Sequence, residues 1–196
     1  MAGVIGLDVG GANTKAVWRD GDARRTVSRP YEVWRDRETL TAVVRDVVAE
    51  AAGGETVTLV ALTTTAELSD AFRTKREGVA FVLDAVEAAL SAPALVFTTA
   101  GDLLGLAAAR TRPLDVAAAN WVASALAVGA VHPDALMLDV GSTTADVIPI
   151  ARGRVAAAGR TDLDRLLAGE LLYTGVLRTN LATIAPRVPV LSLIHI

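Results

Sequence analysis

Apolar and polar positions along the chain predict short strands joined by polar turns, and this pattern occurs twice. In the first half, apolar runs predict strands over residues 3–9, 13–18 and 24–28, with a Gly-Asp turn signal before the third. In the second half, the same succession is predicted over residues 135–140, 145–150 and 154–158. We therefore expect two structural repeats, each opening with a hairpin.

Helices and further strands are predicted after each hairpin. Asp36 is the expected N-cap of a helix that runs to Ala52 and is ended by Gly53, because its apolar residues recur at helical spacing. A second helix carries an apolar face from Val79 to Leu90 and stops before Pro93. The remaining predictions are strands over residues 56–62 and 94–99, and helices over residues 114–129 and 161–168.

This order of elements predicts a mixed α/β protein of two lobes, each with a mixed sheet flanked by helices. We expect the first lobe to span residues 1–131, with a hinge at the GAVHPD stretch, residues 129–134. The second lobe, residues 132–190, has its hairpin but few of the elements that follow the hairpin in the first lobe. It is therefore expected to be truncated.

The last six residues, LSLIHI at positions 191–196, resemble the translation of one reading frame of a common sequencing-transposon end. On this interpretation the tail is non-native, the natural part of the sequence stops near Val190, and His195 has no function. The alternative is a genuine apolar C-terminal strand.

Composition excludes several functional classes. Hydrophobic residues make up 52% of the 196 residues, enough for a large core, and yet no apolar run reaches the roughly 18–20 residues of a membrane span. The start of the chain lacks the basic region of a signal peptide, so we expect a cytoplasmic protein without a membrane partner. A net charge of −3 gives no support for nucleic-acid binding. Without cysteine, and with two histidines, neither a disulfide nor a thiolate or multi-histidine metal site is expected.

The candidate chemistry lies in the turns of the two hairpins. GLDVGGANTKAV, residues 6–17, and LDVGSTTADV, residues 138–147, each place an aspartate at the end of an apolar strand, followed by glycine and small polar residues. Glycine lets backbone amides approach an anion closely, and successive amides form a phosphate-binding concavity. Asp8 and Asp139 are suited to hold Mg²⁺ against that phosphate, because Mg²⁺ takes one or two carboxylates and keeps several waters.

Eight turn residues are the predicted phosphate ligands: Gly10, Gly11, Asn13, Thr14, Gly141, Ser142, Thr143 and Thr144. Neither turn has the spacing of a Walker A loop or of a dinucleotide-binding fingerprint. An ordinary hairpin turn is the alternative for either copy alone. Two copies of one layout, 131 residues apart, favour two hairpins that clamp one anion between the lobes.

A third candidate region, residues 63–78, follows the end of a predicted strand, where α/β proteins bind ligands. The alternative is the ordinary solvated start of a helix. The polar residues that could line a site there are Glu67, Asp70, Arg73, Thr74, Lys75 and Glu77.

The hairpin motifs resemble the two phosphate motifs of the actin, heat-shock-chaperone and sugar-kinase superfamily, which implies an actin-like, ribonuclease H-like fold. A closer resemblance, from Val4 to about Thr179, is to the hydantoinase A/oxoprolinase-like proteins linked to tetrahydromethanopterin-dependent one-carbon metabolism. The stretches that carry it are IGLDVGGANTKAV, TAELSDAFRTKREGV, AAANWVASA, MLDVGSTTADVIPI and GELLYTGVLRT.

This resemblance implies the activity of the methanofuran-pathway condensing group within that family. A transferase of this kind joins a furan-methyl diphosphate to the phenol oxygen of a tyramine-type substrate and releases diphosphate. Two alternatives stay open: an ATP-dependent amidohydrolase of the hydantoinase or oxoprolinase type, and a non-catalytic nucleotide-binding protein of the actin class. In each case the partner is a small-molecule diphosphate or nucleotide.

On the condensing hypothesis, Asp8 and Asp139 hold Mg²⁺ on the diphosphate, and Lys15 neutralises charge as the diphosphate leaves. Asp146 or Glu67 is the candidate base for the phenol. The candidate contacts to the amine-side substrate are Glu170, Tyr173 and Arg178.

Overall fold

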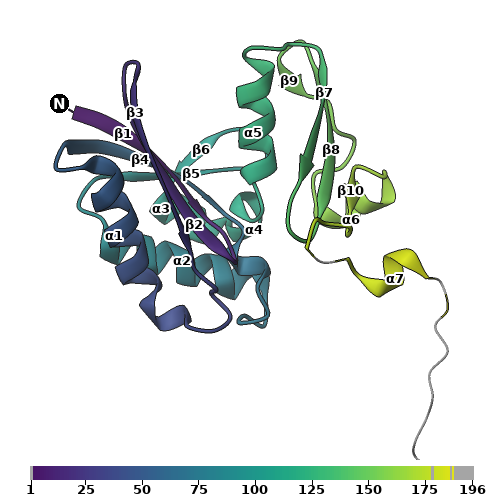
Figure 1. Ribbon diagram of the computed structural model, residues 1–196, viewed down its shortest axis with the longest axis horizontal. Helices are drawn as coiled ribbons and strands as arrows, with labels where there is room; N and C mark the ends of the chain where they lie inside the picture. The colour runs from purple at the N-terminus through teal and green to yellow at the C-terminus, as the bar shows by residue number, and fades with distance from the viewer. Residues whose placement is uncertain (1, 178, 186, 188–196) are drawn as a thin grey trace, which may run out of the picture. The chain divides into compact units, whose positions relative to one another are not determined.

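The computed structural model describes residues 2–177, 179–185 and 187 of the chain (Figure 1). These residues divide between Ser124 and Ala125 into two compact units, each built on its own sheet. The division falls within helix α5 (Asn120–Gly129), upstream of the lobe boundary at residue 131 that the sequence predicts. The tail at residues 191–196, including His195, lies outside the described residues.

The first sheet has six strands in the order β3-β2-β1-β4-β5-β6. β1, β2 and β3 form an antiparallel meander, β4 and β5 continue the sheet parallel to β1, and β6 closes it antiparallel. The first five strands have the order of a ribonuclease H-like, actin-like fold, which confirms the predicted fold class. The strands are β1 (Ala2–Val9), β2 (Asn13–Asp20), β3 (Ala23–Pro30), β4 (Thr56–Thr64), β5 (Ala94–Phe97) and β6 (Leu103–Gly105).

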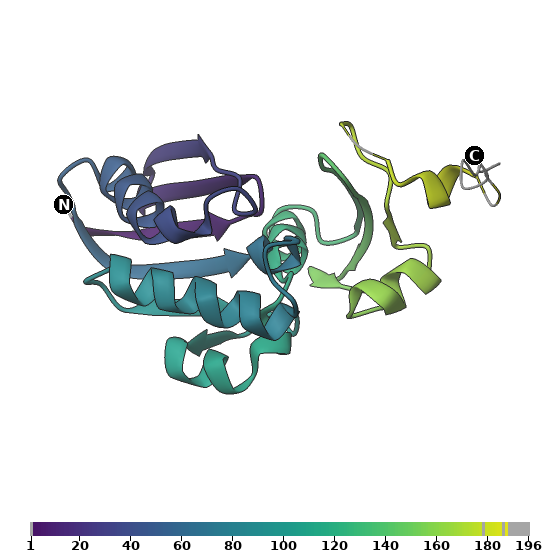
Figure 2. The same cartoon turned by 90° about the horizontal axis from the view of Figure 1, so that it is seen from below.

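Two amphipathic helices, α1 (Leu40–Ala52) and α2 (Lys75–Ala89), cover one face of this sheet and pack against each other (Figure 2). The alternating residues Ile5, Leu7 and Val9 of β1 point to this face and are at most 2% exposed. The apolar face of each helix and alternate residues of the strands are buried in one core, and this burial of apolar surface stabilises the unit.

The start of α1 differs from the prediction that Asp36 is its N-cap. A short 3₁₀ turn, η1 (Arg37–Thr39), comes first, and Thr39 occupies the N-cap position of α1. The Asp36 carboxylate accepts the hydroxyl of Thr39 instead of a backbone amide of the first turn. The end of the helix is as predicted, because Gly53 adopts the left-handed conformation with φ 58°.

The single helix predicted over residues 114–129 is wrong, because the chain breaks between α4 (Pro113–Val116) and α5. Ala118 has φ 50°, a conformation that a residue with a Cβ rarely adopts. Its amide donates to Glu67 Oε1 at 2.7 Å, a tertiary bond that offsets the strain. The residues that precede α4 contain β6 and the short helix α3 (Leu106–Thr111).

The second unit has a four-stranded sheet in which β7 (Ala135–Val140) and β8 (Ala145–Ala151) form the predicted hairpin. Two short strands, β9 (Arg154–Val155) and β10 (Leu171–Leu172), both pair with β8. The third predicted strand is therefore shorter than residues 154–158, and β10 was not predicted. Helix α6 (Asp162–Leu167) starts at the capping box of Thr161 and Asp164, and α7 (Leu181–Ile184) follows β10.

No helix in the described parts of the chain has both the length and the apolarity needed to cross a bilayer.

Candidate functional site

The two hairpin turns have the same backbone bonding. Val9 pairs with Thr14, and Val140 pairs with Ala145, so that each hairpin closes on a turn of four residues. In each turn the amide of the first residue donates to the carbonyl of the fourth: Gly10 to Asn13 at 2.9 Å, and Gly141 to Thr144 at 2.8 Å. The repeated layout in the sequence thus corresponds to a repeated turn in the structure.

Carbonyl groups of the first turn are held by the segment that follows β3. The amide of Tyr31 donates to Ala12 O at 2.9 Å, and the amide of Val33 donates to Gly11 O at 3.0 Å. Both carbonyls are therefore turned toward protein donors.

Carbonyl groups of the second turn are held by a segment that begins after β10. Val176 donates to Gly141 O at 3.0 Å, and Leu177 donates to Ser142 O at 3.1 Å. Gly175 makes this approach possible, because a Cβ there would lie 2.4 Å from Thr143 N and 2.5 Å from Ser142 O. The GELLYTGVLRT stretch is thus packed directly on the turn, a relation that its sequence does not reveal.

The two middle amides of each turn have no acceptor among the described residues. Those of Gly11 and Ala12, and those of Ser142 and Thr143, donate to no acceptor in the described parts of the chain. Successive amides of this kind are the donors from which anion-binding nests are built. In the second turn, Gly175 packs against the amide of Thr143.

Asp8 lies at the end of β1, between its neighbours on β2 and β4. Its Oδ1 accepts the Thr63 hydroxyl at 3.0 Å, and Lys15, opposite it in the strand register, places Nζ 4.0 Å from Oδ2. Partial burial raises the pKa of the Asp8 carboxyl above its ordinary value, while the Thr63 bond and the Lys15 charge oppose that rise. Thr63 was not predicted individually; its signal is its position at the end of the parallel strand beside β1.

Asp139 and Asp146 lie directly opposite each other on β7 and β8, so both carboxylates are on one face of the sheet. Arg165, a residue that the sequence analysis missed, is 1% exposed and donates from Nη1 to Asp146 Oδ1 at 2.7 Å. Burial raises the pKa of Asp146, and the neighbouring charge of Asp139 adds to that rise while Arg165 opposes it. The Asp139 carboxylate has no partner among the described residues.

Glu67, a candidate base, lies in the interior of the first unit and is 2% exposed. Its Oε2 accepts the hydroxyl of Thr64 at 2.8 Å, and its Oε1 accepts the amide of Ala118. Burial raises the pKa of its carboxyl, and the two hydrogen bonds oppose that rise. Gly78 packs on it so closely that a Cβ there would lie 2.6 Å from Glu67 Cα.

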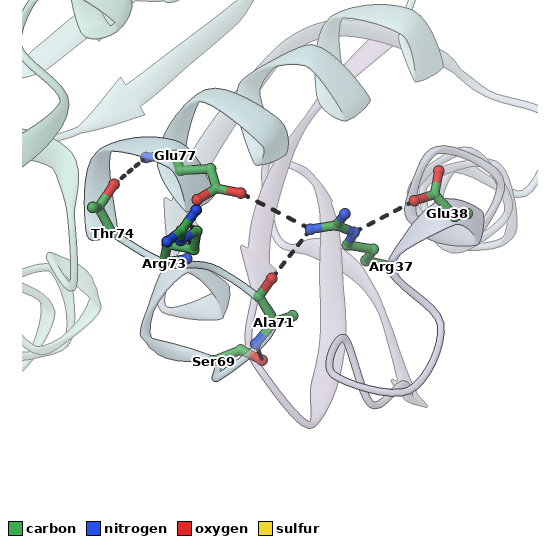
Figure 3. Close-up of polar contacts among 7 residues, drawn as sticks. All are labelled: Arg37, Glu38, Ser69, Ala71, Arg73, Thr74 and Glu77. Atoms are coloured by element: carbon green, nitrogen blue, oxygen red, sulfur yellow. Dashed lines mark hydrogen bonds and ion pairs between the residues drawn. The ribbon is translucent and has the colours of Figure 1, made fainter.

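The polar residues after β4 serve mainly the start of α2 (Figure 3). Thr74 accepts the amide of Glu77 at 3.1 Å, and the Glu77 carboxylate accepts the amide of Arg73 at 3.0 Å. Arg37 donates to Ala71 O at 3.1 Å and lies 4.0 Å from Glu77. These contacts match the alternative of an ordinary helix start for Arg73, Thr74 and Glu77.

Two of the three predicted amine-side contacts, Glu170 and Tyr173, lie in the described parts of the chain. Glu170 accepts the amides of Ala158 at 2.7 Å and Gly159 at 3.0 Å, so its carboxylate anchors the loop before α6. Tyr173 is half-buried and opens the segment that packs on the second turn. Arg178 lies outside the described residues.

The described residues contain no cluster of three or more His, Cys, Asp or Glu side chains suited to a metal. Within each unit, charged and polar side chains lie beside the hairpin turn. Asp8, Lys15 and Thr63 lie beside the first turn. Asp139, Asp146 and Arg165 lie beside the second.

The strand order of the first unit and the hairpin repeated in the second define an actin-like α/β protein. Within that class, a family model described as Hydantoinase/oxoprolinase matches residues 55–190. The chain belongs to the hydantoinase/oxoprolinase family.

Two curated relatives have the same name, (4-{4-[2-(gamma-L-glutamylamino)ethyl]phenoxymethyl}furan-2-yl)methanamine synthase. The protein from Methanocaldococcus jannaschii is 37% identical over 186 residues, which cover 94% of this chain and 54% of the relative. The protein from Methanococcus vannielii is 45% identical over 58 residues, 30% of this chain and 26% of the relative. The chain thus spans about half the length of the first relative.

Solved structures with a similar chain path share little sequence with it. The ethanolamine utilization protein EutJ from Carboxydothermus hydrogenoformans is 20% identical with a TM-score of 0.47, and the match covers 85% of this chain and 56% of that one. A ROK family glucokinase from Streptomyces griseus is 19% identical with a TM-score of 0.46, over 80% of this chain and 47% of that one.

Proposed function

We propose that this chain is part of a transferase that condenses a furan-methyl diphosphate with a tyramine-type phenol and releases diphosphate. The observation that carries the proposal is the 37% identity, over 94% of this chain, to a synthase whose name describes a phenoxymethyl-furan ether. Because the chain spans 54% of that relative, the activity is assigned to the complete protein.

The turns suit the diphosphate product. Each turn presents free amides with hydroxyl or amide side chains beside them, a combination that binds phosphate oxygens. Of the predicted ligands, we assign this role to Gly11 and Asn13 in the first turn, and to Ser142, Thr143 and Thr144 in the second. The amides of Gly10 and Gly141 already donate within their turns, and Thr14 is 0% exposed, so these three residues have no direct role in the proposal.

Asp8 and Asp139 suit Mg²⁺. Asp139 has no protein partner among the described residues, and Asp8 has one oxygen bonded to Thr63 and the other facing Lys15. One carboxylate from either turn with phosphate oxygens and water is an ordinary Mg²⁺ ligand set. When bound, the ion would neutralise the charge of the leaving diphosphate.

The reaction breaks the bond between the furan methylene carbon and a diphosphate oxygen, and forms a bond from that carbon to the phenol oxygen. Lys15, whose side chain is 55% exposed, is placed beside Asp8 to neutralise the departing charge. A phenol with an ordinary pKa of about 10 must give up its proton to a base. We favour Asp146 for this role, because both oxygens of the alternative, Glu67, are bonded within the interior.

The test is diphosphate release by the complete protein with Mg²⁺, the furan-methyl diphosphate and γ-glutamyltyramine, without ATP. Asp8→Asn and Asp139→Asn are each expected to lower turnover by about 10²–10³, as the loss of one preorganised electrostatic group typically does. Asp22→Asn, in the exposed β2–β3 turn, is the matched control and should retain full turnover. Full turnover in Asp8→Asn would contradict the proposal.

A second candidate, an ATP-dependent cyclic-amide hydrolase, is favoured by the description of the family model. It predicts phosphate release that requires both ATP and hydantoin or oxoproline. Nucleotide binding without either product would instead support the non-catalytic alternative.

A further inference from the structure

One strained residue of the first unit is bonded to a buried carboxylate. Ala118 lies at the break between α4 and α5 with φ 50°, a backbone conformation that persists only where the surrounding structure imposes it. The amide of Ala118 donates to Oε1 of Glu67, and the two residues are 8% and 2% exposed. The neighbouring Ala117 forms a parallel bridge with Thr64, the last residue of β4. Two contacts therefore fasten this break to the end of β4.

Glu67 is held on its other side as well. Its Oε2 accepts the hydroxyl of Thr64 at 2.8 Å, and the oxygen of that hydroxyl accepts the amide of Ala66 at 3.2 Å. Gly78 of α2 packs on the side chain so closely that a Cβ there would lie 2.7 Å from Glu67 Cβ. Burial of a carboxyl group is costly unless its oxygens are bonded, and here both of them are. Packing and bonding therefore fix the reach of this side chain to Ala118.

The segment that carries Glu67, residues 64–68, also contacts the first turn. Thr65 donates its amide to Val9 O at 3.0 Å, at the point where β1 passes into the turn. The hydroxyl oxygen of Thr65 would lie 3.6 Å from a Cβ on Gly10, the first residue of the turn. A displacement of this segment would therefore be passed on to the first turn.

We propose that Glu67 is a positioning residue for the first turn, because its bond to Ala118 anchors the segment after β4 that packs on that turn. The inference rests on the proposed function in one respect, namely that the first turn binds the diphosphate. The side chain acts through its length and its hydrogen bonds, and not as a proton acceptor. A substitution that loses the reach to Ala118 should therefore weaken substrate binding, whereas a neutral acceptor of the same length should preserve it.

The first measurement is hydrogen exchange in the 196-residue chain, at the amides of Ala118 and Thr65. Glu67→Asp keeps a carboxylate but is a methylene too short to reach Ala118, so both amides should exchange at least about ten-fold faster. Glu67→Gln keeps the length and an acceptor oxygen, and both amides should stay within about two-fold of the unsubstituted chain. Adding Ala118→Gly to Glu67→Asp should slow exchange at Thr65 again, because glycine adopts φ 50° without the steric penalty of a Cβ.

The second measurement is diphosphate release by the complete protein with Mg²⁺, the furan-methyl diphosphate and γ-glutamyltyramine. Glu67→Asp should raise the KM for the furan-methyl diphosphate about ten-fold with a smaller change in kcat, which is the pattern of lost substrate binding. Glu67→Gln should keep this KM within about two-fold of the unsubstituted protein. Val86→Ala truncates a core residue of α2 that is 0% exposed; it is the control for general destabilisation and should leave the KM unchanged.

Three results would overturn the proposal. Impaired turnover in Glu67→Gln with full turnover in Glu67→Asp would mean that the charge of this residue matters, and not its reach. Unchanged exchange at Thr65 in Glu67→Asp would mean that the segment is anchored without the bond to Ala118. An equal rise of the KM in Val86→Ala would reduce the effect to lost stability. If the unsubstituted complete protein releases no diphosphate, the proposed function fails, and the exchange results still decide whether Glu67 anchors the segment.

Discussion

The two hairpins share a turn and differ in everything that surrounds it. Both close on four residues, bond their turn carbonyls to a later segment and leave amides free. In the first, the residue opposite the partly buried aspartate is Lys15, whose side chain is 55% exposed. In the second it is Asp146, whose compensating charge comes from the buried Arg165. The motif therefore specifies the turn, whereas the electrostatics of each site depend on residues outside it.

The largest expected difference in stability is between variants that remove these two cations. Arg165→Met leaves Asp146 without its partner next to Asp139, and should lower the unfolding free energy of the second unit by about 4 kcal/mol. Lys15→Met removes an exposed pair and should change the first unit by less than about 0.5 kcal/mol. Hydrogen exchange at β8 and β2 amides measures the two units separately. The double variant Arg165→Met/Asp146→Asn should recover part of the loss, and equal losses in the two single variants would remove the distinction.

The covering of the strands predicts the next difference. Leu7→Ala empties space in a closed core and should cost about 3 kcal/mol, whereas Leu138→Ala trims an exposed side chain and should cost less than about 0.5 kcal/mol. The measurement is unfolding of the 196-residue chain in urea, with hydrogen exchange at backbone amides used to report on each unit separately. A comparable loss in Leu138→Ala would mean that β7 is already covered.

The turn glycines should differ by a smaller amount. A Cβ on Gly10 would lie 2.8 Å from Asn13 O, so Gly10→Ala should destabilise the first unit by about 1–2 kcal/mol. At Gly141 the nearest atom to such a Cβ is Thr144 O at 3.4 Å, and Gly141→Ala should cost less than about 0.5 kcal/mol. Thermal melting of both variants compares them. Equal losses, or a larger loss at Gly141, would contradict the expected difference between the two turns.

The smallest effect sharpens the contrast between Asp146, which is bonded to a buried arginine, and Glu67, whose carboxyl oxygens accept from a hydroxyl and a backbone amide. Burial raises the pKa of Glu67 above its ordinary value of 4.5, so its contribution to stability is full below pH 4.5 and is lost as the pH rises through the folded-state pKa. Glu67→Gln retains an acceptor for Ala118 and should abolish this decline, with little change below pH 4.5. The measurement is the unfolding free energy from pH 4 to 8, and an unaltered decline in the variant would assign it to another group.

The strands and the two motif aspartates could be predicted because alternation and turn chemistry are local. The break at Ala118 could not, because alanine favours helix and the bond from its amide to Glu67 joins residues far apart in sequence. Glu67 was predicted as a site residue or as part of a solvated helix start, and its burial depends on the packing of Gly78 and on its bond to Ala118, both distant in sequence. Arg165 and Gly175 were missed for the same reason, since their partners lie on elements that the local pattern does not connect.

The dependence of each turn on a distant segment bears on peptide mimics. A synthetic octapeptide with the sequence of residues 139–146 contains every motif position, yet it lacks the donors at Val176 and Leu177 that hold the turn carbonyls away from a ligand. Its carbonyls would compete with its amides, and an isolated hairpin of this size is marginal in water. On the proposed function, the smallest piece of this protein expected to bind phosphate is therefore a folded unit and not the signature by which a motif search would find it.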